Sequence, residues 1–191
     1  YVKKVQGKGT FITYKKEKMY LNKPRGFKET LSSKGHSSKN DIIQASFLNA
    51  DGDISEKLSI PLNTKVVYLE RLVWEDNEPM AIDKIYIEDE KFPGFITKLS
   101  KDLSFYTILE KDYNIQPKHA VLEIDGIIAQ NQHADLLKCN IGDPLFSINK
   151  ISYDFEDKPI HYSSTIVRCD RATYVVHTDN SNMMNTKTKS K

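Results

Sequence analysis

The sequence is short of the residues that build metal centres and disulfide frameworks. Its 191 residues include 2 cysteines, Cys139 and Cys169, which form no CxxC pair and stand far from any close pair of histidines. This spacing favours two reduced thiols over a disulfide or a zinc site. The 5 histidines are scattered, so no metal site and no catalytic set of serine or cysteine with histidine can be assigned. We therefore expect no metal ion and no cofactor.

The sequence also lacks long apolar runs and a strong charge of either sign. No stretch approaches the roughly 20 apolar residues of a membrane span, and no signal peptide opens the chain. We therefore expect a cytoplasmic protein without a membrane partner. The net charge of +2 is too small to indicate nucleic-acid binding by the chain as a whole. Because the chain opens on Tyr1 rather than on methionine, we expect a piece of a longer protein.

What the chain does have is apolar sequence for one globular domain, and an internal repeat. Hydrophobic residues make up 39% and charged residues 28%, ordinary proportions for a domain that buries its own core. Residues 54–87 resemble residues 134–167, with Leu58 and Leu137 standing 79 positions apart. Such a repeat implies two copies of one supersecondary unit that share a core.

Each copy of the repeat predicts a short helix followed by a β-hairpin. The first copy has strands at 66–74 and 80–87, and the second has strands at 145–153 and 160–167. In both copies a polar turn closed by proline separates the two strands. Two hairpins in one sheet bury a common face, so the sequence predicts an α+β fold with an antiparallel sheet and flanking helices.

Further segments complete the predicted fold. A helix is expected at 104–110, where apolar residues recur at helical spacing after the candidate N-cap Ser104. Strands are expected at 121–129 and at 172–177, and the second of these is predicted to close the sheet. Residues 180–191 are polar and are expected to be disordered.

The N-terminal segment differs in character from the rest. Residues 1–14 predict a short hairpin that is basic and carries no acid, so Lys4, Lys8 and Gly9 are candidate DNA contacts. The alternative is a basic turn that is merely solvated. Residues 15–25 are polar and predict a linker.

Several segments carry a family resemblance through their order and spacing. They are Gly7-Lys8-Gly9-Thr10-Phe11-Ile12, Glu70-Arg71-Leu72, Pro79, Ser104-Phe105-Tyr106-Thr107-Ile108-Leu109-Glu110 and Arg168-Cys169-Asp170-Arg171. Together they resemble the UTRA effector-binding domain of the GntR superfamily of transcription regulators, HutC subfamily. The first segment looks like the wing that ends a winged helix, and the last is similar to the Arg-Gly-Asp-Arg run that closes a UTRA domain.

The resemblance implies a chorismate lyase-like fold, a homodimer and a small-molecule effector such as a sugar phosphate or a small carboxylate. Effector binding would move two DNA-reading heads and release operator DNA from the full-length protein. The chain would divide into a wing remnant at 1–14, a linker at 15–25, an effector-binding domain at 26–179 and a tail at 180–191. A short helix is expected at 27–33, and the rest of the winged helix is expected upstream.

Arg71 is the first candidate for the effector site. It lies mid-strand among apolar residues, where a guanidinium needs an anionic partner, and its fork of donors suits a phosphate or a carboxylate. The resemblance implies that Arg71 contacts the anion of the effector. The alternative is an internal ion pair with Glu70 or another acid.

Ser104 and Tyr106 are candidates because they begin a predicted helix, where free backbone N–H groups attract an anion. The alternatives are a plain N-cap for Ser104 and a half-buried aromatic for Tyr106. His161 and Ser163 share one face of a predicted strand, and Tyr174 could form a wall against a sugar ring. A structural role is the alternative for each of these three.

Other positions bear on the nature of the effector. The ion-pairing run Arg168–Arg171 is expected to hold the end of a strand together. His161 stands where the family usually has glutamate. Val73 stands where some phosphosugar-binding members have a second arginine, and Gly26 where some have serine. A sugar phosphate stays the favoured effector, ahead of a carboxylate or an unphosphorylated sugar.

Two other functions stay open. An enzyme is one, since chorismate lyase shares the implied fold, but no acid, base or nucleophile set can be assigned, and we expect no enzymatic activity. A dimerisation module without a ligand is the other. It predicts a pocket filled by core side chains and no stabilisation by any metabolite, whereas turnover of chorismate or an ester would indicate the enzyme.

Overall fold

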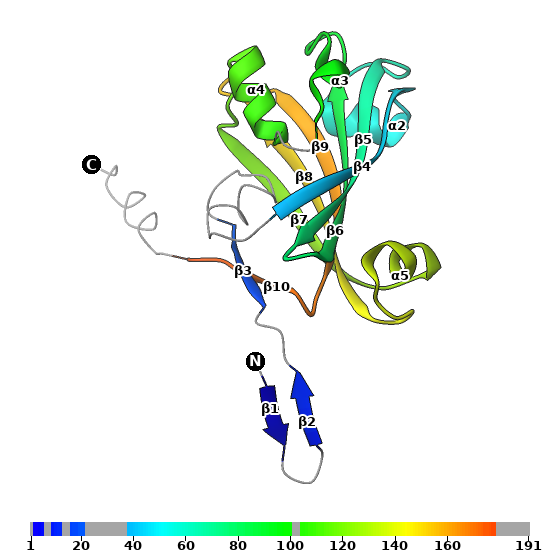
Figure 1. Cartoon of the computed structure of the whole chain (residues 1–191). Helices are drawn as coiled ribbons and strands as arrows, with labels where there is room; N and C mark the ends of the chain where they lie inside the picture. Colours follow the sequence, from blue (N-terminus) through cyan, green and yellow to red (C-terminus); the bar gives the residue numbers. More distant parts are fainter. Residues whose placement is uncertain (1, 6–8, 13–15, 22–37, 101–103, 179–191) are drawn as a thin grey trace, which may run out of the picture.

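The centre of the structure is a six-stranded antiparallel sheet in the order β4-β5-β6-β9-β8-β7 (Figure 1). The computed structural model describes residues 2–5, 9–12, 16–21, 38–100 and 104–178. The strands of the sheet are β4 (Ser38–Asn49), β5 (Lys65–Glu75), β6 (Glu78–Glu88), β7 (His119–Ile128), β8 (Pro144–Tyr153) and β9 (Pro159–Arg168). The predicted α+β fold with an antiparallel sheet is confirmed.

The internal repeat is also confirmed, and it is longer than predicted. In each copy an outer strand leads into a short helix and then a hairpin: β4, α2 (Gly52–Leu58), β5 and β6, then β7, α5 (Asn131–Leu137), β8 and β9. The two copies meet at the middle of the sheet, where β6 pairs with β9 and Asp83 lies opposite Thr165. From either edge of the sheet, the order is therefore the outer strand, then the first and then the second strand of the hairpin.

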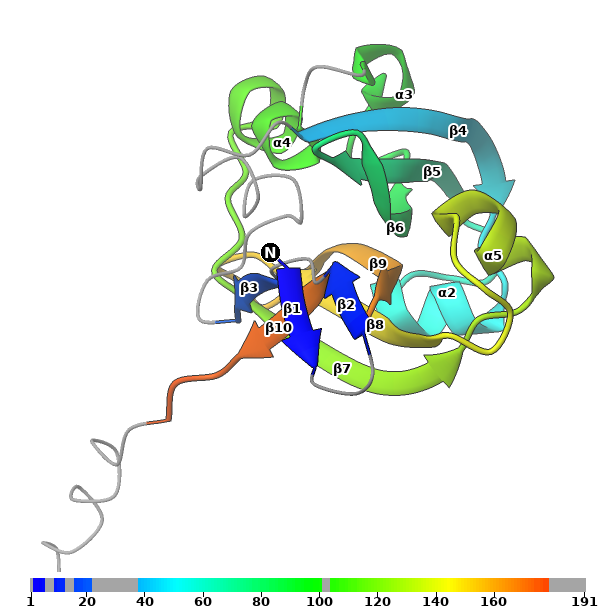
Figure 2. The ribbon, with the colours of Figure 1, turned by 60° about the horizontal axis from the view of Figure 1, so that its bottom comes forward.

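The helices of the repeat pack across the junction between the copies. Leu58 of α2 lies in one apolar cluster with Tyr162 of the second copy. Leu137 of α5 lies in another with Leu72 and Ile82 of the first copy. We call this side of the sheet the α2/α5 face; Figure 2 shows both helices on it. Because both copies contribute to each cluster, neither copy buries its own helix alone.

The opposite side, which we call the α4 face, is covered at one end by helices. They are α3 (Phe95–Lys98) and α4 (Phe105–Tyr113). Leu109 of α4 packs in one cluster with Ile85 of the sheet. The predicted N-cap is confirmed, since Ser104 Oγ accepts a hydrogen bond of 3.0 Å from the backbone N–H of Thr107. No helix in the described part of the chain is long and apolar enough to cross a membrane.

A short parallel pair covers the other end of the α4 face. It consists of β3 (Glu17–Tyr20) and β10 (Ala172–Val175). Met19 of β3 is 4% exposed and packs with Val73 of the sheet. The prediction that residues 172–177 close the sheet is therefore wrong. Both edges of β9 are already paired, with β6 and β8, so the chain leaves the sheet after β9 and lies across its face.

The predictions for the segments outside the two hairpins differ in their outcome. The polar segment 15–25, predicted as a linker, contains β3, because one buried methionine and a parallel partner are enough to order it. The long strand β4 was not predicted, since a bulge between Ile42 and Gln44 breaks the alternation of side chains. The helix predicted at 27–33 and the tail at 180–191 lie outside the described residues.

The predicted N-terminal hairpin is present as two antiparallel strands, β1 (Val2–Val5) and β2 (Gly9–Ile12). Figure 1 shows it beyond β3 and β10, away from the six-stranded sheet. Of the candidate DNA contacts, Lys4 lies in β1 and Gly9 lies in β2. Lys8 lies outside the described residues, and DNA binding by the hairpin stays a prediction.

The crosswise packing predicts that equivalent leucines of the two copies matter equally. Leu58→Ala and Leu137→Ala should each lower the free energy of unfolding by about 2–5 kcal/mol, because both leave a cavity in a buried cluster. Urea unfolding would measure this, with Leu62→Ala as control, since Leu62 is 63% exposed. A loss confined to one of the two leucines would show that only one copy depends on the crossing.

Candidate functional site

The α4 face carries a row of polar side chains between its two apolar ends. Strand alternation and register bring them together. We call this row the polar belt; it comprises Arg71, Asp83, Lys150, Ser152, His161, Ser163 and Thr165, with Tyr106 of α4 above it. On β6, for example, Asp83 lies between Ala81 of one apolar cluster and Ile85 of the other. Three predicted site residues, Arg71, His161 and Ser163, are thus on one surface.

Arg71 is engaged by an acid within the belt. Its Nε and Nη2 both donate to Oδ2 of Asp83, at 2.9 and 2.7 Å, and both residues are about 5% exposed or less. Thr165 Oγ1 donates to the other carboxylate oxygen at 2.8 Å. The internal pair weighed for Arg71 is therefore present, although its partner is Asp83 and not Glu70. Contact between Arg71 and an effector stays a prediction.

Lys150 is a belt residue that sequence reasoning missed. It stands 79 positions after Arg71, the offset of the repeat, and it lies opposite Ser163 in the same way that Arg71 lies opposite Asp83. Its Nζ donates to Tyr106 Oη at 3.0 Å. It is half-buried and forms no ion pair within the described part of the chain. Among the described residues, no acid therefore balances the positive charge that Lys150 places on the belt.

His161 is buried beside Tyr106. It is 1% exposed, and its Nε2 lies 3.4 Å from Tyr106 Oη. Burial holds the pKa of His161 well below its usual value of 6.5, and the charges of Lys150 and Arg71 lower it further, so the ring is neutral at pH 7. Its Nδ1 has no hydrogen-bond partner among the described residues. A buried nitrogen left unpaired is costly, and a polar ligand or a water would satisfy it.

The phenol oxygen of Tyr106 lies close to polar atoms of several belt residues. It lies within 3.4 Å of polar atoms of Lys150, Ser152 and His161, which come from β8 and β9. The predicted role of Tyr106 near the site therefore has a geometric basis. Asn40 of β4, which sequence reasoning also missed, lies opposite Val73 on the same face, is 2% exposed and has no hydrogen-bond partner for its amide among the described residues.

Two predicted residues lie outside the group of side chains around Tyr106 Oη. Ser104 serves as the N-cap of α4 and also hydrogen-bonds Thr107 Oγ1 at 2.9 Å. Tyr174 packs edge-on against Phe146 at 5.2 Å, in the cluster beneath β3 and β10. Burial raises the pKa of Tyr174, and its Oη has no partner among the described residues. An effector contact by either residue stays a prediction.

The closing run of charged residues forms the ion pairs that were expected. Arg168 donates to both oxygens of Asp170, at 3.0 and 2.7 Å, and to the backbone carbonyl of Leu137. Arg171 lies 3.3 Å from Glu78. These contacts tie the turn after β9 to α5 and β6. In the described part of the chain no group of three His, Cys, Asp or Glu side chains could hold a metal ion.

Comparison with known proteins identifies the family. The profile of the UTRA domain matches residues 33–173. The chain belongs to the UTRA domain family. It is 30% identical to an uncharacterised HTH-type transcriptional regulator, YurK of Bacillus subtilis, over 93% of this chain and 73% of the relative. It is 34% identical to a probable fructoselysine utilization operon transcriptional repressor of Shigella flexneri, over 90% of this chain and 70% of the relative.

The fold of this UTRA domain matches that of a solved regulator. The crystal structure of PhnF from Mycobacterium smegmatis superposes with a TM-score of 0.84 at 23% identity, covering 94% of this chain and 78% of that chain. The family match, the relatives named as HTH-type transcriptional regulators and this shared fold together confirm the resemblance to the UTRA domain of GntR-type transcription regulators. The relatives are named as regulators of transcription.

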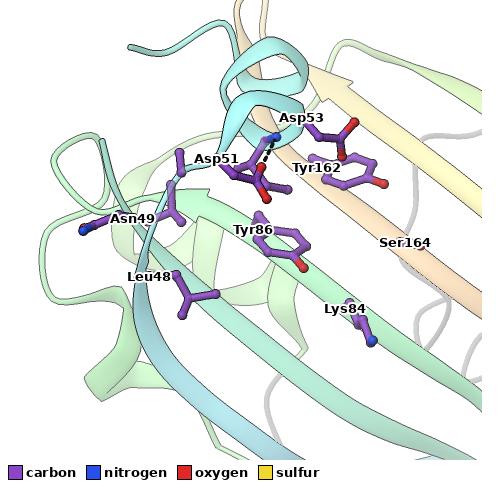
Figure 3. Close-up of a pocket in the computed structure, with 11 residues that line it drawn as sticks. Leu48, Asn49, Asp51, Asp53, Lys84, Tyr86, Tyr162 and Ser164 are labelled. Atoms are coloured by element: carbon purple, nitrogen blue, oxygen red, sulfur yellow. Dashed lines mark hydrogen bonds between the residues drawn. The ribbon is translucent and has the colours of Figure 1, made fainter. Parts of the chain in front are cut away.

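A separate pocket lies on the α2/α5 face of the UTRA domain, away from the belt. Its volume is about 270 Å³, and it lies between α2 and the strands β6 and β9 (Figure 3). The side chains around it include Asp51, Asp53, Lys84, Tyr86 and Tyr162. None of the predicted effector residues lines it.

The buried pair predicts a strong dependence of stability on Arg71. Arg71→Met should lower the free energy of unfolding by about 3–5 kcal/mol, because the Asp83 carboxylate is then buried without its partner. The double variant Arg71→Met with Asp83→Leu should recover most of this loss. Urea unfolding measures both, and the control is Lys84→Met, since the side chain of Lys84 is 43% exposed. Equal losses in the single and double variants would contradict a structural pair.

The depressed pKa of His161 predicts a pH dependence. Below pH 6.5 the unfolded chain protonates this histidine while the folded protein does not, so folding stability is complete above that pH and declines as the pH falls. Between about pH 7.5 and 5.5 the decline due to His161 should reach roughly 1 kcal/mol, and it should vanish in His161→Gln. The exposed His177 offers a control as His177→Gln. Identical pH slopes for wild type and His161→Gln would contradict the neutral buried ring.

Proposed function

We propose that this UTRA domain is the sensor of a transcription repressor, and that its effector is a small anionic metabolite, in first place a phosphorylated sugar, held on the polar belt. The observation that carries the proposal is Lys150. Of the two equivalent cations of the repeat, Arg71 is neutralised by Asp83, whereas Lys150 faces a serine and has no acid beside it in the described residues. A half-buried cation of this kind is suited to an anionic ligand.

The groups around Lys150 suit the rest of a sugar. Ser163 lies opposite Lys150, and Ser152 lies opposite His161. Hydroxyls can both donate and accept, and the neutral ring of His161 has one buried nitrogen without a partner. These groups would meet sugar hydroxyls, and the ammonium would meet the phosphate or a carboxylate. The name of the Shigella flexneri relative, which refers to fructoselysine utilization, also supports a sugar derivative.

The output of the sensor is proposed to be release of operator DNA by a homodimer in the cytoplasm. Met19 of β3 packs with Val73 and Ala81, which are next but one to Arg71 and Asp83 on their strands. β3 follows the N-terminal hairpin in the chain. A ligand that shifts the belt could therefore act on β3 and, through it, on the DNA-reading segment, provided that it binds the released state more tightly. Light scattering should give twice the chain mass of 22.0 kDa.

The test is a thermal-shift screen with phosphosugars, free sugars, fructoselysine and small carboxylates. An effector at about 100 times its Kd should stabilise the protein by about 2.7 kcal/mol. Lys150→Met should abolish the response to an anionic effector, whereas Lys111→Met, an exposed lysine on α4, should keep it. The proposal fails if Lys150→Met responds as wild type does. A chain that no member of the panel stabilises would instead favour the dimerisation module.

A further inference from the structure

The pocket on the α2/α5 face is unrelated to the proposed effector site. Its floor is made by Lys84 and Tyr86 of β6 and by Tyr162 and Ser164 of β9. These residues alternate along their strands with Asp83, Ile85 and Ser163, so they point to the other side of the sheet. Figure 3 shows Asp51 and Asp53 above the two tyrosine rings, at the start of α2. A ligand in this pocket would not touch the polar belt.

Two tyrosine rings form part of the floor of the pocket. The rings of Tyr86 and Tyr162 are stacked, with centroids 5.7 Å apart and planes 19° apart, and Tyr68 lies 5.1 Å beyond Tyr86. The face of an aromatic ring attracts a cation. The chain's own Lys57 illustrates this, since its Nζ lies 5.0 Å from the centre of the Tyr162 ring. Tyr86 has no such cation over its ring in the described structure.

The charges around the pocket leave one acid unpaired. Lys84 lies 3.8 Å from Glu70, and Lys57 lies 3.6 Å from Asp53. Asp51 Oδ1 accepts the backbone N–H of Ile54 at 2.9 Å, but no cation pairs with Asp51 among the described residues. The carboxylates of Glu70, Asp53 and Asp51 and the ammonium groups of Lys84 and Lys57 sum to a net charge of −1. In the described part of the chain, the carboxylate without a cation beside it is that of Asp51.

We infer that this pocket binds a compact organic cation, a primary amine whose ammonium group lies between the Asp51 carboxylate and the rings of Tyr86 and Tyr162. A carboxylate supplies a charge-assisted hydrogen bond, and the rings supply cation–π attraction with an apolar surface for the carbon chain. The volume of about 270 Å³ admits a molecule of a few heavy atoms.

The state of the two phenols agrees with this role. Burial raises the pKa of Tyr86, and so do the neighbouring Tyr162 and the charge of Asp51. Burial also raises the pKa of Tyr162, with the charge of Asp53 adding to it. Both phenols therefore stay neutral at physiological pH and add no charge of their own to the pocket.

The experiment compares 1,4-diaminobutane with 1,4-butanediol by isothermal titration calorimetry on the whole chain. The two probes have the same length, so only the ammonium groups distinguish them. The diamine should bind saturably, and the diol should not. Asp51→Asn should weaken the diamine by about tenfold or more, because it removes the charge while asparagine keeps the helix cap. Tyr86→Leu, which removes the ring, should weaken it as well.

Two controls locate the binding. Glu56→Gln removes an exposed acid of α2 outside the pocket and should leave diamine affinity unchanged. Lys150→Met, on the other face, should also leave it unchanged. Equal binding of diamine and diol, undiminished affinity in Asp51→Asn, or no saturable binding at millimolar concentration would each overturn the inference. These outcomes are independent of the effector screen, because the two sites share no residue.

Discussion

The pairing of β6 with β9 is the interaction on which the remaining structure depends. It is the seam where two copies of one strand-helix-hairpin unit meet, and the helix of each copy is buried in part by strands of the other. Asp83 stands in this seam, bonded along one strand pair to Arg71 and along the next to Thr165. A charged group at the centre of a sheet is tolerated because each carboxylate oxygen has a donor. The seam thus fixes the register of the sheet and, with it, the positions of all belt residues.

A symmetrical repeat has produced an asymmetrical site. At equivalent positions of the two hairpins, Arg71 faces Asp83 and Lys150 faces Ser163. The first position holds a buried ion pair, whereas the second holds a lysine that has no acidic partner among the described residues. The two copies also differ at the neighbouring belt position, where Ala81 of the first copy corresponds to His161 of the second. The first copy thus holds a complete ion pair, whereas the second holds Lys150 without an acid and a buried His161 whose Nδ1 has no partner among the described residues.

The two faces of the sheet differ in the sign of their open charge. On the α4 face Lys150 lacks an acid, and on the α2/α5 face Asp51 lacks a base within the described residues. Both faces are built on β6 and β9, whose successive side chains point to opposite sides of the sheet, so the two sites share strands but no residue.

The sequence by itself determined the elements that depend on neighbouring residues. The two hairpins with their proline-closed turns, the repeat, and the α4 helix with Ser104 at its N-cap follow from spacing and local hydrogen bonding, and the family follows from their order. Only the tertiary structure decided the rest. The partner of Arg71 lies on the next strand, and β10 leaves the sheet because β9 has no free edge. A bulge in β4 interrupts the alternation of side chains by which the sequence would have predicted that strand. Whether a cation is neutralised or open depends on which residue faces it across the sheet, and side-chain periodicity along one strand carries no information about its neighbour.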